Sequence, residues 1–342
     1  MTLTSTMDVL VCAAPGELKV EQRPTPAPGP DDVLLRVRRV GICGTDMHIY
    51  RGTQPYLSYP RVMGHELSGE VISAPDGSGL EEGDHAYVMP YLSCGTCPAC
   101  NKGKTNCCMN IRVLGVHIDG GLCEYLTVPV GFVRKVEGVG LDEAAMVEFL
   151  AIGAHAVRRA SINAAQSVLV VGAGPIGIAA ALFAKLAGAE VTVLDARADR
   201  LAFCSEHLGA DRVVTLSGET PQALSDLTGG VFFDVVFDAT GSAAAMQQGF
   251  AYVAHGGTYV LISVVSADIT FSDPEFHKRE MSLLASRNAT IEDFDHVLSS
   301  IKAGQVPTAA LNTHQAALKD LSEALPGWME PSAGVIKAIV AC

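Results

Sequence analysis

One glycine-rich turn constrains the fold of this chain more than any other feature. Gly172, Gly174 and Gly177 are spaced as G-x-G-x-x-G, directly after the apolar run VLVV and directly before the helical run PIGIAAALFAKLAG. Such a triplet alone is weak, but a strand, a tight turn and a helix in this order let the backbone approach a pyrophosphate at the helix N-terminus. The segment therefore predicts a dinucleotide-binding turn.

A carboxylate at the end of the next strand bears on the choice of dinucleotide. Asp195 closes the run VTVLD, 18 residues after Gly177. A carboxylate at this place accepts hydrogen bonds from the adenosine ribose hydroxyls and repels a 2′-phosphate, which favours NAD over NADP. Arg197 and Arg200 leave the alternative open, because an arginine beside the ribose accommodates that phosphate. We expect both arginines to lie solvated at the start of the following helix.

Apolar strand-like runs alternate with helical runs after residue 140. A helix is predicted first, over 141–160, from LDEAAMVEFLAIGAHAVRRA. The six strands predicted after it are Val168–Val171, Glu190–Leu194, Val213–Val214, Val235–Asp238, Thr258–Ser263 and Ser282–Ser286. This alternation is typical of an α/β fold with a doubly wound parallel sheet of the Rossmann type.

The chain before residue 140 has a different character. Short β-branched runs, such as Asp32–Val40 and Ala86–Tyr91, stand between Pro and Gly clusters and predict a β-rich unit. The tail from Ile291 is predicted as one helix, a proline-containing loop and the strand Gly334–Val340, which we expect to return to the β-rich unit. A length of 342 residues suits about two such domains.

The charge balance argues against several classes of partner. The chain carries 24 Lys and Arg against 37 Asp and Glu, a net charge of −13. We therefore expect no general attraction to nucleic acid or to an anionic membrane, so that an anionic ligand must be captured locally. The run Ser167–Ala184 is uncharged over 18 residues, but its glycines and Pro175 predict a strand, a turn and a buried helix instead of a membrane span.

Ten cysteines point to metal binding. The first eleven residues carry no Lys or Arg before a long apolar run, so the cytoplasm is the expected location, where cysteines seldom form disulfides. Cys94, Cys97, Cys100 and Cys108 are separated by gaps of two, two and seven residues. Four thiolates complete a tetrahedral zinc site without an open position, which predicts a structural zinc. The adjacent Cys107 is the alternative to Cys108.

A second set of residues has ligand chemistry of another kind. Cys43 stands in GICGTDMHIY, and His65 and Glu66 stand in PRVMGHELSGE. A thiolate, an imidazole and a carboxylate hold zinc while leaving a position for water or substrate, as catalytic sites require. Glu148 interrupts the apolar run Ala144–Gly153, where a buried carboxylate is costly unless it meets a cation or hydrogen-bond donors. These residues are consistent with a second, catalytic zinc; the alternative is a hydrogen-bonded structural histidine and a cysteine packed in the core.

In the motifs GICGTDMHIY, PRVMGHELSGE, CGTCPACNKGKTNCC, VVGAGPIG and VVFDATG, the chain resembles the zinc-dependent medium-chain alcohol and polyol dehydrogenases. The resemblance extends from Met7 to Cys342 and implies a β-rich GroES-like catalytic domain, over 1–156 and 291–342, with a Rossmann NAD-binding domain over 157–290. The subgroup is similar to sorbitol, threonine and sugar-acid dehydrogenases. GVHIDGG, FSDPEFHKRE and SRNAT resemble bacterial L-galactonate or L-gulonate 5-dehydrogenases.

The resemblance implies roles for individual residues. Cys43, His65 and Glu66 match zinc ligands, and Glu148 matches a glutamate that either ligates this zinc or holds its water. Thr45 and His48 match the positions that relay the substrate proton. Cys108 is favoured as the fourth ligand of the structural zinc. The residues expected to contact the cofactor are Gly172, Gly174, Pro175, Ile176, Gly177, Asp195, Arg200 and Thr240. One departure from the family pattern is Phe149, which stands where a proline usually follows the glutamate.

The function predicted from these residues is NAD- and zinc-dependent oxidation of a secondary hydroxyl of a polyol or sugar acid. Two alternatives are an L-threonine 3-dehydrogenase with the same zinc and cofactor, and a non-catalytic sensor that binds NAD and zinc. A sugar acid requires a cation for its carboxylate, and Arg112, Lys278 and Arg287 are candidates. Family resemblance also implies a homodimer or homotetramer.

Overall fold

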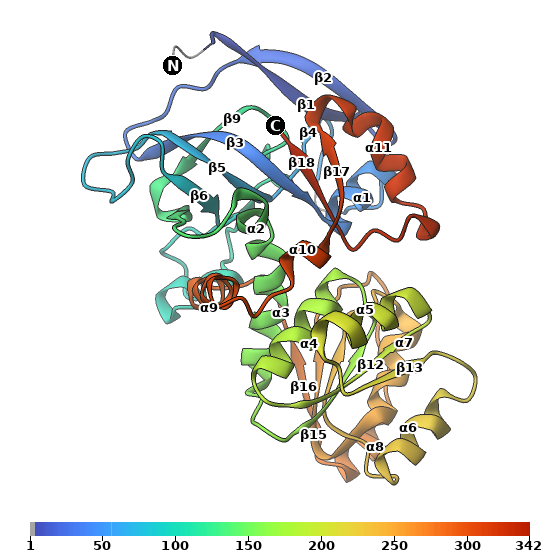
Figure 1. Cartoon of the computed structure of the whole chain (residues 1–342). Helices are drawn as coiled ribbons and strands as arrows, with labels where there is room; N and C mark the ends of the chain where they lie inside the picture. Colours follow the sequence, from blue (N-terminus) through green and yellow to red (C-terminus); the bar gives the residue numbers. More distant parts are fainter. Residues whose placement is uncertain (1–3, 56) are drawn as a thin grey trace. The chain divides into compact units, whose positions relative to one another are not determined.

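The computed structural model describes residues 4–55 and 57–342, which form two compact units (Figure 1). The first unit comprises 1–148 and 298–342, and the second comprises 149–297. Both boundaries between the units fall inside helices: the first inside α3 (Val147–Ala160) and the second inside α9 (Ile291–Lys302). The domain boundaries predicted from the sequence, after residues 156 and 290, stay predictions.

A six-stranded parallel sheet forms the centre of the second unit. Its strand order is β13-β12-β11-β14-β15-β16, and every neighbouring pair is parallel. The strands are β11 (Ser167–Val171), β12 (Glu190–Asp195), β13 (Arg212–Thr215), β14 (Phe233–Asp238), β15 (Val253–Leu261) and β16 (Ser282–Ala285). All six predicted strands are present, and the predicted α/β fold class is confirmed.

The helices of this unit connect successive strands. They are α4 (Pro175–Leu186), α5 (Ala198–Leu208), α6 (Thr220–Thr228), α7 (Ala243–Gly249) and α8 (Asp273–Lys278). Helix α4 packs on β11 and β12, and α7 packs on β14 and β15. The strand order reverses between β11 and β14, which is where open α/β sheets bind ligands, beyond the carboxyl ends of the strands.

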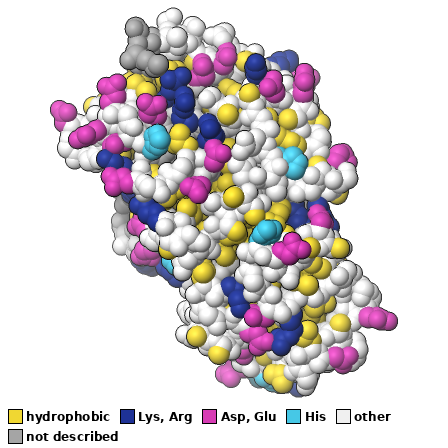
Figure 2. All heavy atoms as spheres, in the orientation of Figure 1, with side chains coloured by type: hydrophobic (Ala, Val, Ile, Leu, Met, Phe, Trp, Pro, Cys, Tyr) yellow, Lys and Arg dark blue, Asp and Glu magenta, His cyan; other side chains and the backbone are white. Residues whose placement is uncertain are grey.

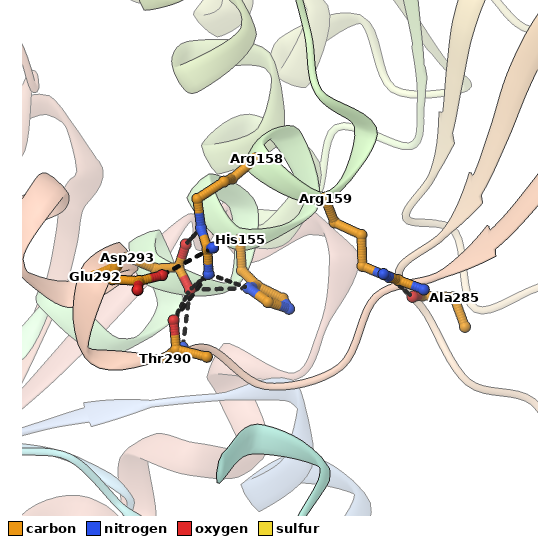
Figure 3. A network of polar contacts seen from close by, with 7 residues as sticks. All are labelled: His155, Arg158, Arg159, Ala285, Thr290, Glu292 and Asp293. Atoms are coloured by element: carbon orange, nitrogen blue, oxygen red, sulfur yellow. Dashed lines mark hydrogen bonds and ion pairs between the residues drawn. The ribbon is translucent and has the colours of Figure 1, made fainter. Parts of the chain in front are cut away.

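A polar network holds α3 against the start of α9 within the second unit (Figure 3). Asp293 is buried and accepts hydrogen bonds from His155 Nδ1 at 2.8 Å, Arg158 Nε at 2.6 Å and the Thr290 amide at 2.8 Å. Burial opposes ionisation of Asp293, but the hydrogen bonds from His155 and Arg158 outweigh it and hold its pKa well below the ordinary value. Thr290 and Asp293 also form the start of α9, since they are spaced as in a capping box.

The first unit is built from mostly antiparallel sheet around one apolar core, with β17 and β18 as a parallel pair. Its main sheet follows the order β10-β6-β5-β3-β18-β17, with β9 also paired to β3. These strands are β3 (Asp32–Ile42), β5 (Glu66–Ser73), β6 (His85–Val88), β9 (Tyr125–Pro129), β10 (Val133–Lys135), β17 (Asn312–Ala317) and β18 (Lys337–Ala341). Two smaller sheets join β1 (Thr6–Ala14) with β2 (Glu17–Pro24) and β4 (Arg61–Val62), and β7 (Tyr91–Leu92) with β8 (Arg112–Val113). The predicted β-rich unit is confirmed.

The tail of the chain returns to this unit, as expected, because β18 pairs antiparallel with β3. Its predicted content is incomplete, since the single predicted loop contains β17, α10 (Thr308–Leu311) and α11 (Leu321–Trp328). The strand β17 reads NTHQAA and lacks the β-branched run that predicts a strand. The helix predicted over 141–160 is also wrong in one detail, because it breaks at Met146 between α2 (Leu141–Ala145) and α3.

The uncharged run Ser167–Ala184 folds as β11, a turn and most of α4, as predicted. Within 4–55 and 57–342, no helix combines the length and the apolar character needed to cross a membrane. Acidic and basic side chains are interspersed over the face drawn in Figure 2, so neither sign dominates that face.

Candidate functional site

Two neighbouring strands bring three possible metal ligands together. Cys43 directly follows β3, and His65 directly precedes β5. These strands pair antiparallel with Gly41 opposite Glu66, so the end of one strand meets the start of the other. One ligand atom from each of Cys43, His65 and Glu66 lies within 4.8 Å of the other two. The predicted trio is therefore a spatial group.

A buried aspartate that the sequence analysis missed ties the two ligand-bearing turns together. Asp46 accepts the Cys43 amide at 2.9 Å and the Gly64 amide at 3.1 Å. Asp46 is fully buried, and this burial raises its pKa although both backbone bonds oppose the shift. Asp46 is the third residue of helix α1 (Gly44–Arg51), and Cys43 directly precedes that helix. The spacing of three residues between Cys43 and Asp46 is that of a helix-capping pair, and it was the sequence signal that could have identified Asp46.

Glu66 is paired with a lysine from the far end of the chain. Lys337 Nζ lies 2.7 Å from Glu66 Oε1 and 2.6 Å from Oε2, and it also donates to the Ile42 carbonyl at 3.1 Å. The two residues are 1% and 0% exposed. Burial opposes the charge on Lys337, but Glu66 and Cys43 outweigh burial and raise its pKa. A single lysine within the apolar strand VIKAIV was the signal for this residue.

Glu148 approaches the same group from the first turn of α3. It is 5% exposed, and the Tyr91 hydroxyl donates a hydrogen bond to its Oε1. Burial raises the pKa of Glu148 to about 7, against the opposing influence of His65. The carboxylate does not lie within 4.8 Å of all three ligand atoms, so it stands outside the trio.

The charge of this buried group fits a divalent cation. The neighbouring Cys43 thiol, Asp46 and Glu148 raise the pKa of His65 well above its ordinary value, although burial alone lowers it. The group thus combines one thiol, one imidazole and three carboxyl groups with the ammonium of Lys337. Buried carboxylates are costly unless cations or hydrogen-bond donors compensate them. Sulfur, nitrogen and oxygen donors together suit zinc.

The two predicted relay residues lie on α1, next to the metal group. Thr45 Oγ1 is 3.8 Å from Cys43 Sγ. His48 follows three residues later, on the same face of the helix, and its Nδ1 contacts Thr53 Oγ1 at 2.9 Å. His48 is exposed, whereas Thr45 is half-buried. Thr45 therefore lies beside the metal group, and His48 lies on the solvent-exposed side of the same helix face.

The four-cysteine lobe has the closed arrangement expected of a structural site. Cys94, Cys97, Cys100 and Cys108 each offer a sulfur within 4.8 Å of the other three. Hydrogen bonds from the Thr96 and Cys97 amides lower the pKa of Cys94 to about 5, which favours its thiolate, whereas burial raises the pKa of Cys100 to about 12. Cys107 is exposed and outside the group, so the structure places Cys108 in the fourth position.

The glycine-rich turn of the second unit has the geometry of a phosphate site. Gly172 has a φ of +95°, and a Cβ on Gly177 would lie 1.8 Å from the Gly172 carbonyl oxygen. These two glycines permit the tight turn and the close approach of α4 to it. Gly174 precedes α4, where a Cβ would meet open space, and Pro175 is the first helical residue with Ile176 after it. The space beside Gly174, at the start of α4, is thus open.

The residues predicted to read the nucleotide lie around this turn. Asp195 ends β12, and it accepts the Ala173 amide at 2.6 Å and the Arg197 amide at 2.8 Å. Arg197 is engaged by Asp199, with Nη2 2.5 Å from Oδ2. The expected solvated position of Arg200 is wrong: this residue is 8% exposed, because it lies on the inner face of α5.

Thr240, predicted as a cofactor contact, follows β14. Its amide and hydroxyl both bond Asp238 Oδ1, at 3.0 and 2.9 Å. A Cβ on Gly172 would lie 3.2 Å from Thr240 Cγ2, so Thr240 borders the glycine turn at the reversal of strand order. Of the residues predicted to contact the cofactor, the structure thus brings the glycine turn, Asp195 and Thr240 together inside one unit.

The three candidate cations for a substrate carboxylate lie on separate elements of the two units. Lys278 forms an ion pair with Glu275 on α8, and Arg287 follows β16, both in the second unit. Arg112 belongs to the first unit and stands opposite Leu92 in the β7–β8 pair. Paired residues share a face of a sheet and neighbours alternate, so Arg112 points away from the face that carries Tyr91.

Two family models match this chain. Residues 29–138 match the alcohol dehydrogenase GroES-like domain, and residues 175–303 match the zinc-binding dehydrogenase family. The first match contains Cys43, His65, Glu66 and the cysteine lobe, and the second begins at the first residue of α4.

Individual proteins are similar over almost the whole chain. L-galactonate-5-dehydrogenase of Escherichia coli K12 is 43% identical over 320 residues, which cover 93% of this chain and 94% of that protein. The solved structure of an alcohol dehydrogenase, RspB, of Escherichia coli CFT073, complexed with NADH, has a TM-score of 0.92 at 30% identity and covers 99% of this chain and 100% of its own. A zinc-binding dehydrogenase of Sinorhizobium meliloti 1021 bound to NADP has a TM-score of 0.92 at 28% identity, with the same coverage.

Proposed function

This chain belongs to the zinc-binding dehydrogenases with an alcohol dehydrogenase GroES-like domain, and we propose that it oxidises a secondary hydroxyl of a sugar acid to the ketone, reversibly, with zinc and NAD. The observation that carries the reaction class is the group of Cys43, His65 and Glu66, which offers one ion three ligands. Three protein ligands leave the fourth tetrahedral position for substrate. The four-cysteine lobe holds the second, structural zinc.

Zinc, when bound, polarises a hydroxyl and lowers its pKa, so that the hydroxyl gives up its proton near neutral pH. The residues of α1 then have to accept that proton. Thr45 lies next to Cys43, and the exposed imidazole of His48 lies on the same face of the helix. We assign Thr45 and His48 to this proton transfer, which contributes typically ~10²–10⁴-fold to the rate of such reactions.

The proposed hydride acceptor is NAD, held at the turn Gly172–Gly177. Asp195 ends β12, where a carboxylate accepts hydrogen bonds from ribose hydroxyls and repels a 2′-phosphate. Arg197 is occupied by Asp199, which leaves it less able to hold that phosphate. Structural neighbours carry either NADH or NADP, so the residue at position 195 is the basis for choosing NAD.

A sugar acid is the proposed substrate because of the 43% identity to an L-galactonate dehydrogenase. A polyol is the next candidate, since the same metal and relay groups act on any secondary alcohol that fits. We also propose, as expected from the sequence, that the protein is a homo-oligomer and that it is located in the cytoplasm.

The experiment that tests this function is NADH formation from NAD across a panel of L-galactonate, L-gulonate, other aldonates, sorbitol and L-threonine. We expect the highest kcat/KM with an aldonate. A higher kcat/KM with L-threonine would replace the proposed substrate. Zinc-loaded protein that turns over none of these compounds would favour the non-catalytic sensor.

A further inference from the structure

The hydroxyl of Tyr91 is in contact with the one carboxylate of the metal site that lies outside the ligand trio. We propose that Tyr91 is a positioning residue for Glu148: it holds one carboxylate oxygen and leaves the other to face the metal ion and its water. This inference rests on the proposed zinc-dependent function. It assigns to Tyr91 a role that neither its sequence motif nor the ligand group suggests.

The contact is built from two separate elements inside a dry environment. Tyr91 comes from β7 and Glu148 from the first turn of α3, 57 residues later. Tyr91 is 6% exposed and Glu148 is 5% exposed. A hydrogen bond between a buried hydroxyl and a buried carboxylate is stronger than in water, because water does not compete for either group.

The arrangement limits what Glu148 can do. Tyr91 donates to Oε1, and no other hydrogen bond reaches Glu148 from the residues that the structure describes. The hydrogen bond from Tyr91 therefore holds the carboxylate in one orientation. While it persists, it opposes movement of Glu148 toward the ligand trio.

The backbone of Tyr91 is held by the pair of strands on either side of the cysteine lobe. Tyr91 pairs with Val113 across β7 and β8, and the Leu114 amide donates to the Pro90 carbonyl at 3.1 Å. The lobe closes the chain between these two strands, because Cys94 lies three residues after Tyr91 and Cys108 lies four residues before Arg112. A structural metal in the lobe would thus keep the Tyr91 hydroxyl in register with Glu148.

The test uses Tyr91→Phe, which removes the hydroxyl and keeps the ring. With cobalt exchanged for zinc, we expect the visible absorption of the metal site to change, because a released Glu148 moves into the metal's coordination sphere. We also expect kcat to fall about tenfold, which corresponds to about 1.4 kcal/mol. The matched control is Tyr259→Phe, which removes another buried hydroxyl, the donor to the Met246 carbonyl at 2.9 Å, in the other unit.

A double-mutant cycle separates positioning from packing. If Tyr91 acts through Glu148, Tyr91→Phe has no further effect on the cobalt spectrum once Glu148→Ala is present. A spectrum of Tyr91→Phe identical to wild type, or one whose change persists with Glu148→Ala, overturns the proposal. The spectrum requires no substrate, so it reports on Tyr91 even if the panel of alcohols contradicts the proposed function.

Discussion

Lys337 donates hydrogen bonds to both carboxylate oxygens of Glu66, and neither residue has appreciable contact with solvent. The two residues are 271 positions apart and meet because β18 lies next to β3, which in turn pairs with β5. Glu66 therefore enters the metal group with its orientation already determined. Its charge is also partly compensated before any metal binds.

Lys337→Met should destabilise the protein because it leaves Glu66 buried without its partner. Removing one member of a buried ion pair costs about 3–5 kcal/mol. We expect a lower urea midpoint of unfolding and weaker retention of the metal of the Cys43 group during dialysis against a chelator. The matched control is Lys135→Met, which breaks the exposed pair with Asp84 and should change the midpoint little. Equal midpoints for the two variants would contradict a structural role for the buried pair.

The cysteine lobe gives a prediction about metal content. Cys97→Ser should reduce the zinc content from two ions to one per chain and lower the unfolding temperature, because binding energy at a structural site is folding energy. Cys107→Ser is the control, since Cys107 is exposed and outside the ligand group. Elemental analysis and thermal unfolding on the same samples measure both quantities. Two zinc ions in Cys97→Ser would mean that Cys97 is no ligand.

Asp195→Ala should weaken NAD use more than NADP use, because it removes the acceptor for the ribose and the repulsion of the 2′-phosphate. Asp195 also accepts two backbone amides, so the alanine variant disturbs the turn as well. Asp195→Asn keeps the shape and one carbonyl oxygen while removing the charge. We expect Asp195→Asn also to lower the ratio of kcat/KM with NAD to kcat/KM with NADP. A wild-type enzyme that prefers NADP would contradict the assignment.

The fold was largely predictable because its strongest signals are local. Each strand of the parallel sheet is a short apolar run beside a turn, and the run VLVV before Gly172 becomes β11. The polar strand β17 carries no such signal, because its position depends on pairing with β18. The break at Met146 could not be predicted from the sequence either, because the residues of α2 and α3 have continuous helical propensity.

The residues of the candidate site also divide into those with a local sequence signal and those without one. Cys43, His65 and Glu66 could be proposed from residue type, local motif and family resemblance, which need no knowledge of contacts. Lys337 and Tyr91 act through partners that are distant in the sequence, so only the sheet order and the placement of β7 identify them. Their only sequence signals are a lysine inside an apolar strand and a tyrosine ahead of a cysteine lobe.

Asp293 gives a prediction about stability and pH. Its pKa is lower in the folded chain than in the unfolded chain, so its contribution is present at neutral pH and is lost as pH falls below about 4. Asp293→Asn should lower the free energy of unfolding at pH 7 by about 3 kcal/mol, as for a broken buried pair. Its unfolding free energy should also fall less steeply than that of wild type in acid.

The matched control is Glu292→Gln. Glu292 pairs with the same Arg158 at 2.9 Å but is largely exposed, so this variant should behave like wild type (Figure 3). Urea unfolding at pH 7 and at about pH 3, inside the range where the contribution is being lost, measures all three proteins. A wild-type midpoint for Asp293→Asn at neutral pH would show that the network does not stabilise the second unit.

Glu148→Gln separates the charge of this residue from its packing. Gln fills the same space between Val147 and Phe149, which are fully buried, and its amide oxygen still accepts the Tyr91 hydroxyl. The variant should therefore fold and keep most of its zinc. It should turn over more slowly, because a neutral amide accepts a hydrogen bond from water beside the metal ion less strongly than a carboxylate does. The measurement is kcat with zinc content determined on the same sample. Full activity at full zinc content would make Glu148 a packing residue, and its proposed part in the reaction would have to be abandoned.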